Sequence, residues 1–179
     1  MSGRTVPPTG SEPGRARRGP SPSGAPAIRP AAADDLAAIE RVVRRAYEIY
    51  LPRMDRPPAP MLADYRASLA AGTVSVIERE GAVAGVLVLV PAGDHLLLEN
   101  VAVDPAHQGA GLGRALVAFA ERSAALAGFR ELRLYTNAVM VENIGLYAHL
   151  GFEETHRVEE EGYRRIYMTK RLPAGDGRR

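Results

Sequence analysis

The chain has 179 residues, which is a usual length for one domain, and 46% of them are hydrophobic and 25% charged. It contains no cysteine, so disulfides, a thiolate nucleophile and sulfur-ligated metal centres are excluded. The net charge of +2 comes from residues 1–27, which contain four arginines and one glutamate, and the rest of the chain carries −1. We therefore expect no nucleic-acid partner for the body of the protein.

Both ends of the chain read as loose segments. Residues 1–27 hold six of the 14 prolines and five of the 18 glycines, a composition that predicts a disordered tail. We expect one folded domain over residues 28–171 and a second loose tail over residues 172–179. No run of about 18 apolar residues is present, and the four histidines lack metal-ligand spacing. The sequence thus predicts a cytoplasmic protein with no membrane partner and no metal.

Periodicity and turn residues predict a mixed α/β order between these ends. A short strand over 28–30 comes first, followed by a helix that begins after Asp34 or Asp35. In chain order, the expected helices cover 36–50, 61–70, 112–126 and 140–150. The remaining strands cover 73–78, 82–90, 95–103, 132–137, 152–158 and 163–170.

A strand end followed by a glycine-rich helix start is the most informative stretch. Val101-Ala102-Val103 ends a strand, Pro105 marks a turn, and three glycines follow within residues 109–113. Free backbone amides at a helix N-terminus form an anion site that suits a diphosphate. A P-loop is excluded because no lysine is present, and the dinucleotide fingerprint fails because its third glycine would fall on Arg114 or Leu116.

The same stretch contains the pattern Q-x-x-G-x-G, formed by Gln108, Gly111 and Gly113. It resembles the acetyl-coenzyme A signature of the GNAT superfamily of N-acetyltransferases. A second landmark of that family is similar to Asn143-Ile144-Gly145-Leu146-Tyr147, continuing to Gly151-Phe152. The resemblance implies a single GNAT-like domain of the α/β (α+β) class, with a mixed, mostly antiparallel twisted sheet of about seven strands and about four helices.

The resemblance also implies acetyl-coenzyme A as acyl donor. Its pantetheine arm would pair with the backbone of the strand at Val101 and Val103, and the amide of Val101 or a neighbour would donate to the thioester carbonyl. Amides after that strand would hold the pyrophosphate. The implied cofactor-binding residues are Val101, Ala102, Val103, Gln108, Gly109, Ala110, Gly111, Leu112, Gly113, Arg114 and Asn143.

Tyr147 matches the family's usual general acid, which would protonate the departing sulfur. The alternative is that Tyr147 is an amphipathic core residue. The commoner family pattern places an asparagine where this chain has Met140. Either Asn143 or Asn137 therefore contacts the cofactor, unless both only form a cap or an Asx-turn.

Glu99 is our candidate for the catalytic base because it stands in an otherwise apolar strand. Alternation places it on the same face as Val101 and Val103. The alternative is a carboxylate that pairs with an arginine on a neighbouring strand. The resemblance further implies an acceptor site built by the first two helices and the loop between them, around Tyr47, Glu48, Tyr50, Arg53, Met54 and Asp55.

These observations predict an N-acetyltransferase that moves an acetyl group from acetyl-coenzyme A to a primary amine of a small molecule or peptide. Transfer is expected to be direct, because no cysteine can carry the acetyl group. The alternative is a catalytically weak acyl-coenzyme A binding module of the same fold that serves as a sensor or interaction partner. A homodimer is left open.

Overall fold

The computed structural model describes residues 26–173 of the chain. One seven-stranded sheet has the order β1-β2-β3-β4-β5-β7-β6, and its neighbours are antiparallel except for β4 and β5. The strands are β1 (Ala27–Pro30), β2 (Val74–Arg79), β3 (Ala82–Ala92), β4 (His95–Val103), β5 (Glu131–Asn137), β6 (Glu153–Glu160) and β7 (Tyr163–Arg171). The α-helices are α1 (Leu36–Tyr47), α2 (Tyr65–Ala70), α3 (Leu112–Leu126) and α4 (Val141–His149). The expected fold class is confirmed.

The segment between α1 and α2 differs most from the expected helices. The helix expected over 36–50 ends at Tyr47 and continues as the 3-10 helix η2 (Glu48–Arg53), which contains Pro52. The helix expected over 61–70 is divided into the 3-10 helix η3 (Ala59–Leu62) and α2, because a carboxylate oxygen of Asp64 accepts the amide of Ala67 at 3.0 Å and starts a new helix.

The limits of the fold are wider than the sequence indicated. Ala27 pairs with Glu78 in the sheet, and Leu172 is buried and donates its amide to the carbonyl of Arg130. Both residues had been placed in the tails. The other residues of the two expected tails lie outside the described range, apart from Pro26 and Pro173.

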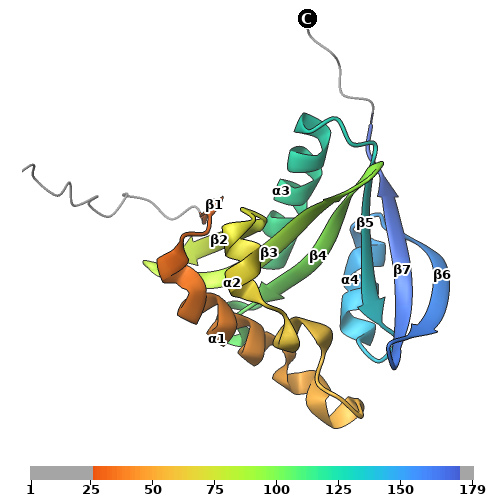
Figure 1. Ribbon diagram of the computed structural model, residues 1–179, viewed down its shortest axis with the longest axis horizontal. Helices are drawn as coiled ribbons and strands as arrows, with labels where there is room; N and C mark the ends of the chain where they lie inside the picture. The colour runs from red at the N-terminus through yellow and green to blue at the C-terminus, as the bar shows by residue number, and fades with distance from the viewer. Residues whose placement is uncertain (1–25, 174–179) are drawn as a thin grey trace, which may run out of the picture.

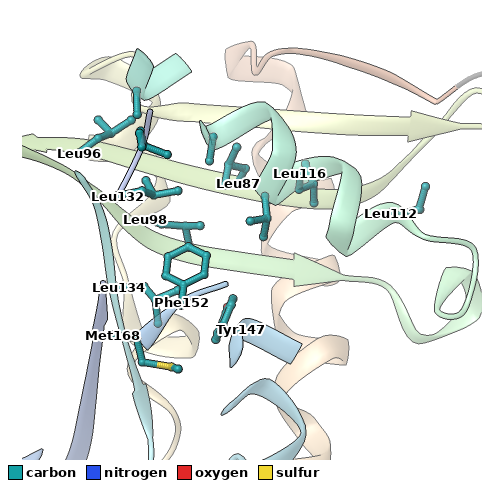
Figure 2. Close-up of a cluster of buried hydrophobic side chains, with 14 of the residues drawn as sticks. Leu87, Leu96, Leu98, Leu112, Leu116, Leu132, Leu134, Tyr147, Phe152 and Met168 are labelled. Carbon is teal, nitrogen blue, oxygen red and sulfur yellow. The ribbon is translucent and has the colours of Figure 1, made fainter. Parts of the chain in front are cut away.

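Two apolar cores lie on opposite faces of the sheet. One forms between α1 and strands β2 and β3, and the other between α3, α4 and the centre of the sheet. Figure 1 shows α1 and α2 on the face opposite to α3. In the second core, Leu116 of α3 packs with strand leucines, and Tyr147 and Phe152 close one end of the cluster (Figure 2). Among residues 26–173, no helix is long and apolar enough to cross a membrane.

Candidate active site

The centre of the sheet opens where its only parallel pair of strands separates. β4 and β5 are paired only from Leu96↔Leu132 to Leu98↔Leu134, although β4 continues to Val103. Figure 1 shows the two strands diverging beyond this point. The edge of β4 that faces β5 therefore has no strand partner over residues 99–103, and an extended ligand can pair with it as an added strand.

Glu99 stands where this strand is irregular. The register of β4 against β3 shifts between Val88↔Asn100 and Leu89↔Leu98, so Glu99 is the extra residue of a bulge. Leu98 belongs to the core on the α3 side and Ala102 to the core on the α1 side, which shows that the alternation changes phase here. The expectation that simple alternation fixes the face of Glu99 was wrong, because a bulge interrupts the period of two.

A glycine turn follows β4 at the N-terminus of α3. Gly109 and Gly111 have φ angles of +79° and +77°, and a Cβ on either would meet nothing within 4 Å. Conformation, not lack of space inside the protein, therefore requires glycine at these positions. Gln108, Ala110 and Arg114 are exposed, whereas the side chains of Ala102 and Leu112 are buried in the core and offer only their backbones to a ligand.

The amides of this turn are free. Within residues 26–173, no backbone or side-chain oxygen accepts a hydrogen bond from the amides of residues 109–114. These donors lie at the positive end of a 15-residue helix. The residues present thus fit a pyrophosphate: they offer several amides, open space and no side chain that would hold phosphate oxygens away.

Asp104 positions this turn and was missed by sequence reasoning. Its side chain is 7% exposed; one oxygen accepts the amide of Ala106 at 2.9 Å, and the other pairs with Arg45 of α1 at 3.0 Å. The turn is therefore attached both to its own backbone and to the helix on the opposite face of the sheet. The Asp-Pro dipeptide was the available signal, since Asp is a common turn cap before Pro.

A cavity of about 320 Å³ lies beside the separated part of β4. It is lined by five of the seven tyrosines, Tyr47, Tyr65, Tyr135, Tyr147 and Tyr163. Glu99, Val101 and Asn137 also line it, whereas Asn143 and the glycine turn lie outside it. Of the residues predicted for catalysis, both Tyr147 and Glu99 are therefore brought to one cavity.

The Tyr147 hydroxyl is poised as a neutral donor. The side chain is 6% exposed, its ring packs edge-on against Phe152 at 5.7 Å between centroids, and its hydroxyl has no hydrogen-bond partner among residues 26–173. Among the described residues, this oxygen is not one of the fully enclosed side-chain polar atoms that lack a hydrogen-bond partner, so it keeps some exposure, and Tyr147 lines the cavity. Burial, with a smaller contribution from Tyr50, raises the pKa of Tyr147 well above its ordinary value.

The Glu99 carboxylate is exposed and forms no ion pair within 4.0 Å among the described residues. The alternative of a pairing with a neighbouring arginine is thus not what the structure shows. The negative charge of Glu99 affects two tyrosines that line the cavity. Burial raises the pKa of Tyr65, a hydrogen bond from Asn100 lowers it, and the charge of Glu99 raises it further. The pKa of Tyr135 is likewise raised by burial and by Glu99, with Arg165 opposing.

The two candidate asparagines have local partners. The side-chain oxygen of Asn137 accepts the amide of Val139 at 3.1 Å, which is an Asx-turn. The side-chain oxygen of Asn143 accepts the Tyr50 hydroxyl at 3.3 Å. Met140 is 5% exposed and its sulfur lies 3.7 Å from the Thr136 hydroxyl. The local alternative thus describes Asn137 well, and a cofactor contact for Asn143 stays a prediction.

Comparison with known proteins agrees with this geometry. A family model described as Acetyltransferase (GNAT) domain matches residues 70–154. The ribosomal-protein-S18-alanine N-acetyltransferase from Escherichia coli superposes with a TM-score of 0.66 at 23% identity, covering 86% of this chain and 98% of that one. Residues 70–154 of this chain thus match the GNAT acetyltransferase family, and the chain shares the fold of the GNAT structures.

Two further relatives are similar to this chain, and one of them was solved with a ligand. The structure of yncA from Salmonella typhimurium, solved with its cofactor acetyl-CoA, has 26% identity and a TM-score of 0.64 over 83% of this chain and 95% of that one. N-acetyltransferase family 8 member 3 of Rattus norvegicus is 33% identical over 86 residues, which are 45% of this chain and 38% of the rat protein. The chain thus matches little more than a third of the length of that relative.

The cavity is lined by residues from more elements than expected for the acceptor site. Tyr47 and Met54 line the cavity as the sequence indicated, but Arg53 instead pairs with Glu142 of α4 at 2.8 Å. Tyr65, Tyr135 and Tyr163 were missed, because their convergence depends on how α2, β5 and β7 are arranged in space. Among residues 26–173, no group of three or more His, Asp or Glu side chains is placed to hold a metal ion.

Proposed function

We propose that this protein transfers the acetyl group of acetyl-coenzyme A directly to a primary amine. The observation that carries the proposal is the shared cavity. It is lined by Tyr147 and Glu99, whose side chains have no hydrogen-bond partner among residues 26–173, and by the separated part of β4. The match of residues 70–154 to the GNAT domain model and the solved relative with acetyl-CoA support the choice of donor.

Acetyl-coenzyme A supplies an activated acetyl thioester, and this chain supplies placement and two proton-handling groups. The edge of β4 and the amides of residues 109–114 hold the extended arm and the pyrophosphate, so that the thioester is fixed beside the cavity. A backbone amide at Val101 or a neighbour donates to the thioester carbonyl oxygen and stabilises negative charge there.

Two protons must move during transfer to an ammonium. Glu99 attracts the cationic amine and takes up its proton, directly or through water, before the nitrogen attacks. Tyr147 donates its phenolic proton to the departing sulfur. Burial favours the protonated phenol, so Tyr147 is present in the form that can donate at neutral pH.

Release of the coenzyme A thiol tests the proposal. Purified protein is mixed with acetyl-coenzyme A and a panel of primary amines, and free thiol and acetylated product are both measured. Amine-dependent formation of both in equal amounts is the expected result. If thiol forms without acetylated amine, or if neither forms with any amine of the panel, transfer to amines is not the function.

Met140 favours the second candidate, a catalytically weak acyl-coenzyme A binding module. This buried thioether stands where the commoner family pattern has an asparagine, and it removes one amide from the site. Such a module would bind acetyl-coenzyme A as tightly as the enzyme but release no thiol with amines. The same experiment, run alongside a direct binding measurement, therefore separates the two functions.

A further inference from the structure

The cavity described above has walls that suit an apolar cation. Five tyrosine rings line it, and aromatic faces attract an ammonium as well as apolar carbon. Its volume of about 320 Å³ lies at the lower end of the range for small-molecule pockets, which is roughly 300–1,000 Å³. Part of this space must receive the acetyl end of the donor, so the acceptor has to be compact.

The unbalanced charge in the cavity is negative. Three charged side chains line it, Asp64, Glu99 and Arg165. Asp64 is engaged as the cap of α2, and Arg165 donates to Glu160 and to Glu161 at 2.9 Å each while it lies 4.5 Å from the centre of the Tyr135 ring. Among the described residues neither carboxylate has an ion pair, and Glu99 also has no hydrogen-bond partner. The negative charge of the cavity thus suits a cationic acceptor. An additional carboxylate on the acceptor would find no unpaired cationic side chain among the residues that line the cavity.

The acceptor side of the cavity is covered by the segment 48–63, which we call the strap. The carbonyl of Pro57 in the strap accepts the Tyr163 hydroxyl at 2.9 Å, and Arg56 donates to the carbonyl of Glu161 at 2.6 Å. Arg53 pairs with Glu142 at 2.8 Å. These contacts join the strap directly to the β6–β7 turn and to α4.

The β6–β7 turn is shaped for this contact. Gly162 has a φ of +75°, and a Cβ added to it would lie 2.7 Å from the guanidinium carbon of Arg56. The same guanidinium lies 5.3 Å from the centre of the Tyr163 ring. Arg56 therefore occupies the space that a side chain at the turn would fill, and the strap closes onto a turn that only glycine suits.

We propose that the acceptor is a compact primary amine with an uncharged body and no carboxylate, bound as its cation between the tyrosine rings and Glu99, and that the strap excludes peptide chains. This inference rests on the proposed function. In the transfer, the amine nitrogen forms a bond to the acetyl carbon as the carbon–sulfur bond breaks. The ammonium loses two protons in all, of which one leaves with the coenzyme A thiol and the other is released to water.

A matched set of amines tests the charge and the size of the acceptor separately. Tyramine and tyrosine differ only in a carboxylate, and a C-terminally amidated tetrapeptide beginning with alanine tests size without adding a carboxylate. We expect kcat/KM for tyramine to exceed that for tyrosine and for the peptide by at least about 10-fold each. Equal values for tyramine and tyrosine, or for tyramine and the peptide, would overturn the inference and leave the proposed function standing.

Two sets of variants test whether Glu99 and the strap determine which acceptor is used. In Glu99→Gln the ratio of kcat/KM for tyramine to that for tyrosine should fall by several-fold, because the charge that repels the carboxylate is gone. In Arg56→Ala combined with Tyr163→Phe, the ratio of peptide to tyramine should rise by several-fold. Arg79→Ala, which changes an exposed arginine at the end of β2, is the control and should leave both ratios unchanged.

The outcomes are distinguishable from failure of the proposed function. If no amine releases thiol from the wild-type protein, the proposed function fails and this inference with it. If tyramine is acetylated but the ratios in Glu99→Gln and in the strap variant stay at their wild-type values, only the inference fails, because neither Glu99 nor the strap then determines the acceptor.

Discussion

The hydroxyl of Tyr47 donates to the side-chain oxygen of Asn100 at 2.7 Å, directly beside the bulge at Glu99. The Asn100 amide in turn donates to the Tyr65 hydroxyl at 2.9 Å, which donates to the carbonyl of Pro60 at 2.9 Å. This buried chain of hydrogen bonds joins α1, β4, α2 and the strap. It fixes the irregular part of β4 on which the proposed chemistry depends.

Tyr47→Phe should destabilise the protein, because it leaves the buried oxygen of Asn100 without its donor. Asn100 is 5% exposed, so water does not replace the bond freely. We expect a loss of about 1–2 kcal/mol in the free energy of unfolding, measured by urea denaturation. A free energy of unfolding equal to that of the wild type would show that the network contributes nothing.

Tyr147→Phe should leave the stability of the protein unchanged and slow the reaction. Its hydroxyl has no partner among the described residues, so removing it costs no hydrogen bond, and the free energy of unfolding should change by less than about 0.5 kcal/mol. The affinity for acetyl-coenzyme A should stay nearly unchanged, whereas thiol release with a reactive amine should slow by about 10²-fold or more, since a general acid is lost. Unchanged turnover would remove Tyr147 from the mechanism.

Gly111→Ala should weaken binding of acetyl-coenzyme A, since alanine at a φ of +77° is strained and the amides of the turn would be displaced. Gly93→Ala is the matched control: Gly93 has a φ of +66° and open space around it, but it lies in the β3–β4 turn, at the opposite end of β4 from the glycine turn. Both variants should lose about 1–2 kcal/mol of stability. Only Gly111→Ala should raise the dissociation constant, and an equal effect of both on binding would refute the anion site.

Asp35 should make stability depend on pH in the acid range. Arg29 donates to its two carboxylate oxygens at 2.7 and 3.0 Å, which, against burial, holds the pKa of Asp35 below its ordinary value. The folded-state pKa is thus below the unfolded value of about 3.9, so the stabilisation is present above that pH and is lost as pH falls through the folded pKa.

Asp35→Asn should therefore lower the free energy of unfolding by about 1 kcal/mol at pH 7. The difference from the wild type should shrink toward pH 2, where the wild-type carboxyl is protonated as well. Urea denaturation of both proteins at pH 7 and at pH 2 measures this difference in the free energy of unfolding. A difference that stays constant between them would mean that the pair with Arg29 is not what stabilises the folded state.

Much of the fold could be predicted from the sequence because its strands and helices have clear periodicity. The helix α3 begins and ends at Leu112 and Leu126 as expected, since Gly111 and Gly128 are flanking glycines with positive φ. The strap was mispredicted, because local helix propensity continues past Tyr47 while Pro52 and Pro60 impose short 3-10 turns.

The candidate site could be predicted only in part. Tyr147, Glu99 and the glycine turn have local signals: a motif, an acid in an apolar strand, and clustered glycines. Asn100, Tyr65 and Tyr163 have none, because their importance arises from contacts between segments 35 or more residues apart. The bulge at Glu99 likewise depends on the pairing of β4 with β3, and a single strand's alternation does not reveal it.

We propose that this chain binds acetyl-coenzyme A and delivers its acetyl group to an amine. The most direct measurement is a titration of acetyl-coenzyme A followed by thiol release with tyramine in the same sample. Acetyl-coenzyme A at about 100 times its dissociation constant should add roughly 2.7 kcal/mol to the free energy of unfolding, and tyramine should then release one thiol per acetylated amine. Absence of any stabilisation by saturating acetyl-coenzyme A would contradict it.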